Sequence, residues 1–148
     1  MSEGRGTVVH LAEIVLWVRD MERALGFYRD VFGLEPMPQP ENVMPRFLRA
    51  GPGEHGVPEM IVLSPHPDPS GSFPREKPQR TLHHLAFNVD RERYDQLQER
   101  CRAAGLEVRT GIHPVLKGVR TFYVDDPDGN EVECITYDPD RADATKVG

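Results

Sequence analysis

The stretch EIVLWVRDMERALGFYRDVFGLE, residues 13–35, is repeated in outline by HLAFNVDRERYDQLQERCRAAGLEV, residues 84–108. Each segment begins with a polar residue, continues as an apolar strand-like run with a valine five residues after the first position, and reaches Gly-Leu-Glu after a helix-like part. The second copy is longer by one residue at that Gly-Leu-Glu. Because internal repeats reflect a repeated structural unit, the sequence predicts two copies of one module.

Apolar residues follow the period of a helix in both copies. After Asp20, a suitable N-cap, they recur at i, i+3, i+4 and i+7, and they stop at Gly33. A second amphipathic helix is predicted from about Asp90 to Gly105. Strands are predicted ahead of each helix and also over residues 46–50, 60–63, 107–110, 119–124 and 131–137. Each half therefore reads as β-α-β-β-β, which predicts an α+β fold.

The predicted modules divide the chain into four segments. Residues 8–65 and 81–138 are the two βαβββ modules, residues 66–80 are a linker and residues 139–148 are a polar tail. The linker is rich in proline and has no periodicity, which excludes a central strand or a helix. GPGEHG, residues 51–56, matches a nucleotide-binding pattern, but no helix follows it, so a hairpin loop is predicted there.

Composition limits the classes of partner. The chain has 148 residues and a net charge of -6, which argues against a nucleic-acid groove or an anionic membrane surface and favours a small-molecule partner. Two cysteines are too few for a disulfide framework, so a cytoplasmic location is expected. We expect neither a signal peptide nor a membrane span, because the apolar runs have the length of strands.

HHLAFNVD, residues 83–90, reads as a strand with two different faces. By alternation, His84 shares its face with Ala86 and Asn88, whereas His83 points to the opposite, apolar face. Such a strand packs a helix on one side and lines a cavity on the other. A single histidine in this setting is usually a core residue with satisfied hydrogen bonds, but its register match to Glu13 in the first copy favours a ligand.

Carboxylates recur on the equivalent strand faces. Glu131 and Glu133 share one face of the last predicted strand, a pattern that usually marks a solvated edge. Glu13 heads an apolar strand and shares its face with Val15 and Trp17. An ionised carboxylate buried there would be strongly destabilised unless it were protonated or bound to a cation.

The strand positions therefore predict a metal centre. His84 and two carboxylates, Glu13 and Glu133, form a set suited to Zn²⁺, Fe²⁺, Mn²⁺, Ni²⁺ or Mg²⁺. Glu59 is a candidate fourth ligand, because PEMIVLSP and NEVECITYDP align it with Glu133 when their final prolines are superposed. A different register of that apolar run would leave Glu59 away from the metal.

Three segments resemble the vicinal oxygen chelate superfamily, which includes glyoxalases, fosfomycin-resistance enzymes, extradiol dioxygenases and bleomycin-resistance proteins. They are VRDMERALGFYRDVFGLE (18–35), HHLAFNVD (83–90) and FYVDDPDGNEVE (122–133). The resemblance spans about residues 8–138. It implies a cupped, eight-stranded mixed sheet around a metal, and a homodimer. Glu13 and His84 fall on the first-strand ligands, Glu133 on the last-strand ligand and Glu59 on the remaining one.

The resemblance implies three alternative activities. In a glyoxalase-like lyase or isomerase, a metal binds vicinal oxygens of the substrate and Glu133 moves a proton. In an extradiol-like dioxygenase, Fe²⁺ serves with His113 and Tyr123 as acid-base groups, although Glu13 stands where those enzymes have a histidine. A metal-free drug-binding protein would stack a planar molecule on Trp17 and Tyr123. The retained ligand set favours a metal-dependent enzyme over drug sequestration.

Overall fold

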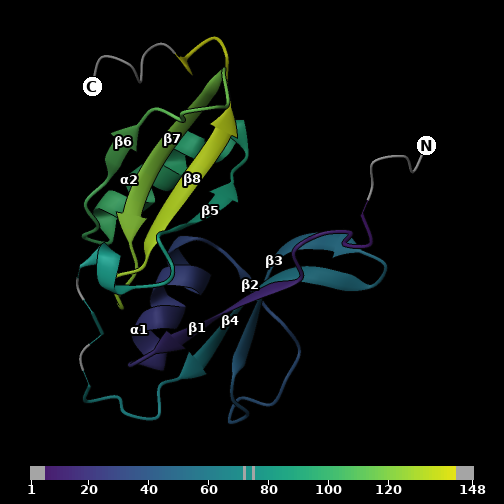
Figure 1. The fold of residues 1–148 in the computed structure, drawn as a ribbon, viewed down its shortest axis with the longest axis vertical. Helices are drawn as coiled ribbons and strands as arrows, with labels where there is room; N and C mark the ends of the chain where they lie inside the picture. The colour runs from purple at the N-terminus through teal and green to yellow at the C-terminus, as the bar shows by residue number, and fades with distance from the viewer. Residues whose placement is uncertain (1–5, 72, 75, 143–148) are drawn as a thin grey trace. The chain divides into compact units, whose positions relative to one another are not determined.

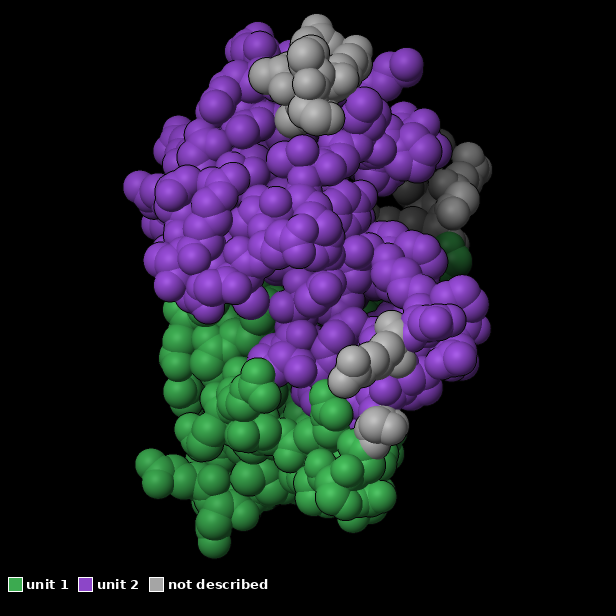
Figure 2. Space-filling view, turned by 90° about the vertical axis from the view of Figure 1, so that its left-hand side faces the viewer, with its two compact units in different colours: residues 1–71 green, residues 72–148 purple. Residues whose placement is uncertain are grey.

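The computed structural model describes residues 6–71, 73–74 and 76–142, so the predicted polar tail is described only as far as residue 142. The chain forms two compact units, residues 1–71 and 72–148 (Figure 1 and Figure 2). The division between the units falls inside the predicted linker. Within the described residues, the structure has no helix of the length and apolarity needed to cross a membrane.

The first unit is a βαβββ module. Its elements are β1 (Glu13–Val18), α1 (Met21–Leu25), β2 (Glu35–Pro36), β3 (Arg46–Glu54) and β4 (Val57–Pro65). The sheet order is β1-β4-β3-β2, with β1 parallel to β4 and the other pairs antiparallel. The module thus brings its first strand next to its last strand.

The helical part of the first unit begins and ends where the sequence predicts. The Asp20 side chain caps α1 by accepting a hydrogen bond from the backbone N of Arg23. Gly33 ends the helical part with a φ of 75°, a conformation that favours glycine. Between them, the predicted helix is present, but it is α-helical only over Met21–Leu25 and continues as π-helical turns over Gly26–Val31.

The second unit repeats this architecture. It contains β5 (Leu85–Asn88), a 3-10 turn (Arg91–Arg93), α2 (Tyr94–Ala103), β6 (Arg109–Gly111), β7 (Val119–Asp125) and β8 (Glu131–Tyr137). The sheet order β5-β8-β7-β6, with β5 parallel to β8, is the order of the first unit. The α+β class and the two βαβββ modules are therefore confirmed. The linker also carries a 3-10 turn, Lys77–Gln79.

Each sheet has one covered face and one open face. In the first unit, Leu16 and Val18 are buried, whereas Val15 and Trp17 on the other face of β1 are 53% and 55% exposed. In the second unit, α2 covers one face of the sheet and packs there through buried side chains such as Tyr94 (Figure 1).

The hairpin loop predicted within residues 51–56 is confirmed, and a second turn joins β7 to β8. A two-residue hairpin joins β3 and β4 at His55 and Gly56, which have φ angles of 55° and 78°. The turn between β7 and β8 is organised by the Asp126 carboxylate, which accepts hydrogen bonds from the backbone N atoms of Asp128 and Asn130 at 2.9 and 2.8 Å. This second turn fixes the start of β8, where both candidate carboxylates lie.

Candidate metal centre

The open face of the second sheet gathers polar side chains from adjacent strands. β8 supplies Glu131 and Glu133, and Tyr123 on β7 is the register partner of Glu133. On the other side of β8, Ala86 of β5 is opposite Glu133. His84 immediately precedes β5 and lies on the same face as Ala86, as the alternation predicted.

The structure brings His84 and Glu133 together. Nε2 of His84 lies 3.1 Å from Oε2 of Glu133, and the two side chains are 35% and 4% exposed. Two donors that each lie about 2.0–2.2 Å from one divalent ion can be roughly 3 Å apart, so this pair fits a shared cation. The structure thus brings together two of the residues that the sequence predicted as ligands.

The second oxygen of Glu133 is held by hydroxyl groups. Oε1 accepts hydrogen bonds from Thr121 Oγ1 at 2.6 Å and from the Tyr123 hydroxyl at 2.9 Å. Burial, together with the bond to Glu133, raises the pKa of Tyr123 and keeps its hydroxyl protonated as the donor. Gly111 makes room for this ring, since a Cβ there would lie 2.7 Å from Tyr123 Cε2. Oε1 is thus engaged by neutral donors, and Oε2 is left facing His84.

The hydrogen bond from Thr121 to Glu133 was not expected from the sequence, and its effect on metal affinity can be tested. Replacing Thr121 by valine keeps the shape of this fully buried side chain but removes the donor to Glu133. Partners of metal ligands typically contribute roughly 10–100-fold to metal affinity, so we expect a loss in that range by isothermal titration with Zn²⁺. Thr121→Ser restores the donor and should recover affinity, and equal affinities for the two variants would contradict this role.

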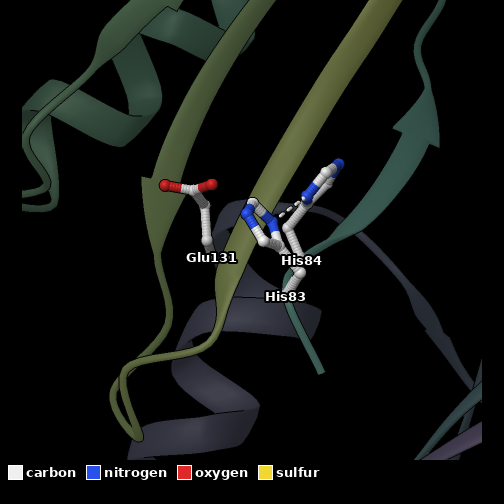
Figure 3. Close-up of side chains that lie close together, drawn as sticks. All are labelled: His83, His84 and Glu131. Atoms are coloured by element: carbon white, nitrogen blue, oxygen red, sulfur yellow. Dashed lines mark hydrogen bonds between the residues drawn. The ribbon is translucent and has the colours of Figure 1, made fainter. Parts of the chain in front are cut away.

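A second group of potential ligands shares His84. Within the described part of the chain, His83, His84 and Glu131 form the group of three whose donor atoms lie within 4.8 Å of one another (Figure 3). The expectation that His83 points to the opposite face from His84 is wrong, because their Nδ1 atoms are 2.7 Å apart. Regular β5 begins only at Leu85, so strand alternation does not extend back to His83.

Glu131 differs from Glu133 in its electrostatic surroundings. Its carboxylate is 2.5 Å from Nζ of Lys77 and 3.1 Å from Nη2 of Arg109, which also binds Asp125. Burial alone would raise the pKa of Glu131, but the hydrogen bonds and charges of Lys77 and Arg109 outweigh it and hold the pKa below its usual range. Glu131 is already neutralised, whereas the described contacts of Glu133 include no lysine or arginine.

The two candidate carboxylates of the first unit lie on opposite faces of its sheet. Glu13 is exposed, so the sequence argument that burial penalises its charge does not hold for the structure. Its register partner on β4 is Met60, and strand alternation places the adjacent Glu59 on the other face. In the first module Val62 of β4 pairs with Val15, as Glu133 of β8 pairs with Ala86 in the second module. Val62 therefore holds the position in β4 that Glu133 holds in β8. The structure gives no support to Glu59 as a fourth ligand, because the proline superposition shifts the register.

A model of the Glyoxalase/Bleomycin resistance protein/Dioxygenase superfamily matches residues 8–134. The chain belongs to this superfamily. The family expected from the sequence motifs is thus confirmed, and the repeated βαβββ topology agrees with it.

Crystal structures of other proteins with this fold match most of the chain. Lactoylglutathione lyase from Agrobacterium tumefaciens has 26% sequence identity and a TM-score of 0.63, covering 88% of this chain and 96% of that one. A glyoxalase/dioxygenase from Nostoc punctiforme has 22% identity and a TM-score of 0.69, covering 90% and 94%. The fosfomycin resistance protein FosX from Listeria monocytogenes has 21% identity and a TM-score of 0.63, covering 92% and 99%.

Two further predicted site residues, Trp17 and His113, lie on β1 and in the loop after β6. Trp17 is exposed on the open face of β1 and contacts His66 edge to face, with ring centroids 5.5 Å apart. His113 lies in the loop after β6, where its Nδ1 accepts hydrogen bonds from the backbone N atoms of Val115 and Leu116 at 3.2 and 2.9 Å. One nitrogen of His113 thus organises its own loop, and Tyr123 contacts Glu133 directly.

Proposed function

We propose that this protein is a divalent-metal-dependent enzyme with glyoxalase-like lyase or isomerase chemistry, acting on a small organic molecule with vicinal oxygen atoms. The observation that carries the proposal is the buried Glu133 carboxylate, which lies 3.1 Å from His84 and accepts bonds from two hydroxyls, with no lysine or arginine among its described contacts. A buried carboxylate is costly unless a positive charge compensates it, and a divalent ion held between Glu133 and a neutral His84 would supply that charge.

Glu133 and Tyr123 carry the proposed proton chemistry. A divalent ion held by His84 and Glu133 would stabilise negative charge that develops on the substrate oxygens. Glu133 moves the proton between substrate carbons or oxygens, and the Tyr123 hydroxyl, 2.9 Å from Oε1, steadies that carboxylate and contacts the substrate. Zn²⁺, Ni²⁺, Mn²⁺, Mg²⁺ and Fe²⁺ all suit this donor set.

Glu13 stays a proposed metal ligand on the strength of the sequence repeat. It is the first residue of β1, His84 immediately precedes β5, and β1 and β5 hold equivalent positions in their own sheets. It shares the open face of β1 with Val15 and Trp17, whose exposed apolar side chains suit a covering surface or a substrate. We propose a homodimer in the cytoplasm, and a monomeric mass by light scattering at micromolar concentration would remove the dimer.

An extradiol-like dioxygenase is the second candidate function. His83, His84 and Glu131 have the composition of the set of two histidines and one carboxylate that binds Fe²⁺ in non-haem oxygenases. Two contacts weigh against it: Glu131 is paired with Lys77 and Arg109, and one nitrogen of His113 is engaged in its loop. The lyase or isomerase class is therefore the better supported.

Metal loading combined with two assays tests the function. Protein purified without chelator is analysed for metal, then loaded with Zn²⁺, Ni²⁺, Mn²⁺ or Fe²⁺ and assayed for conversion of hemithioacetals of 2-oxoaldehydes and for O₂ consumption with catechols. We expect turnover with redox-inert ions and loss of turnover in Glu133→Gln. Oxygen consumption confined to Fe²⁺-loaded protein would favour the dioxygenase. Failure to bind any of these ions, together with tight binding of a planar drug, would favour sequestration.

A further inference from the structure

His84 is held at both of its ring nitrogens. On one side its Nδ1 lies 2.7 Å from Nδ1 of His83, with the ring planes at 72° and the centroids 5.0 Å apart (Figure 3). On the other side its Nε2 lies 3.1 Å from Glu133 Oε2. His83 therefore contacts the nitrogen of His84 that is not directed at the proposed ion.

The contact between the two Nδ1 atoms allows two arrangements of the protons when both rings are neutral. In the first arrangement Nε2 of His84 carries a proton that faces the Glu133 carboxylate, which can only accept hydrogen bonds. Nδ1 of the same neutral ring is then an acceptor, which requires His83 to donate from its own Nδ1. In this arrangement Nε2 of His84 has no lone pair to offer a cation.

We propose that His83 is a positioning residue that sets His84 in the tautomer needed to bind metal; this inference rests on the proposed function. For Nε2 of His84 to act as a ligand it must lose its proton, and Nδ1 must then carry one. In this second arrangement Nδ1 of His84 donates to Nδ1 of His83, and the proton of a neutral His83 lies on its own Nε2.

The surroundings argue that His83 orients a ligand rather than being one. An ion bound by His83, His84 and Glu131 would compete with Lys77 and Arg109 for the Glu131 carboxylate. It would also leave the buried Glu133 without a compensating charge. An ion between His84 Nε2 and Glu133 Oε2 avoids both penalties and leaves Nδ1 of His84 free to donate to His83.

A matched pair of substitutions separates hydrogen bonding from bulk. His83→Asn keeps an acceptor atom attached to Cγ, where the imidazole has Nδ1, and His83→Leu places a methyl group there. His83 is exposed and precedes the strand, so both variants should fold with nearly the stability of the wild type. In isothermal titrations with Zn²⁺, we expect His83→Leu to lose roughly 10–100-fold in affinity, and His83→Asn to stay close to the wild type.

Imidazole ¹⁵N spectra of the Zn²⁺-loaded wild type report which ring nitrogens carry protons or metal. A merely structural role of His83 would not affect these signals. We expect a metal-bound shift at Nε2 of His84, a proton on its Nδ1, and an unprotonated Nδ1 in His83. A metal-bound shift on His83, or unchanged Zn²⁺ affinity in His83→Leu, would overturn this inference alone. A wild-type protein that binds no Zn²⁺ would overturn the proposed function and this inference together.

Discussion

Replacing Glu133 by glutamine is expected to remove most of the bound divalent metal while leaving the fold intact. The amide keeps the size of the side chain and can still accept the hydrogen bonds of Thr121 and Tyr123, but it lacks the charge that faces His84. Because altering only the partners of ligands already costs roughly 10–100-fold, loss of the anionic ligand should lower metal affinity by more than about 100-fold. Isothermal titration with Zn²⁺ measures this directly.

Glu131→Gln is the matched control, since it makes the same chemical change two residues earlier on the same face of β8. Its carboxylate pairs with Lys77 and Arg109, so its loss should affect metal affinity much less. Without metal, Glu133→Gln should be as stable as the wild type or more so, because a buried uncompensated charge is removed. Equal losses of metal from the two variants, or a larger loss from Glu131→Gln, would contradict the assignment of the ion to Glu133.

Replacing Arg120 by alanine is expected to cost about 3–5 kcal/mol of folding stability, the range found when one partner of a buried ion pair is removed. The Arg120 side chain is 9% exposed, lies over the Tyr94 ring at 4.4 Å and reaches Asp95 at 3.0 Å and Asp138 at 3.6 Å. Without it, the buried Asp138 carboxylate loses its nearby cation. Urea denaturation of the metal-free protein gives the free energy of unfolding.

Arg141→Ala provides the comparison for that prediction. Arg141 also binds Asp95, at 2.6 Å, but its side chain is 55% exposed. Exposed ion pairs contribute roughly 0–1 kcal/mol, so the Arg141→Ala variant should unfold at nearly the wild-type urea concentration. If both arginine variants lost the same small amount of folding stability, the buried Arg120 would contribute no more than an exposed arginine.

The modules could be predicted from sequence because their signals are local. The strand before each helix, the cap at Asp20 and the stop at Gly33 are patterns within a few residues of one another. The same alternation placed Glu133 on the face shared with His84. The π-helical turns over Gly26–Val31 were missed, because apolar spacing over so short a segment does not distinguish i→i+5 from i→i+4 hydrogen bonds.

The site was predictable only where strand periodicity reached it. His83 was assigned to the wrong face, because regular β5 begins after it. Thr121 was missed, since a buried threonine on a strand resembles any β-branched core residue until the register of β7 against β8 is known. The pairing of Lys77 with Glu131 joins residues 54 positions apart, from the linker and from β8, and no short pattern announces such a contact.

The most direct test of the central claim is a crystal structure of the Zn²⁺-loaded protein with anomalous diffraction data at the zinc edge. The proposed metal centre predicts an anomalous peak about 2.0–2.2 Å from both His84 Nε2 and Glu133 Oε2. Thr121 and Tyr123 should remain on Glu133 Oε1, as they are in the present structure. A peak coordinated by His83 and Glu131, with Glu133 unliganded, would contradict the account.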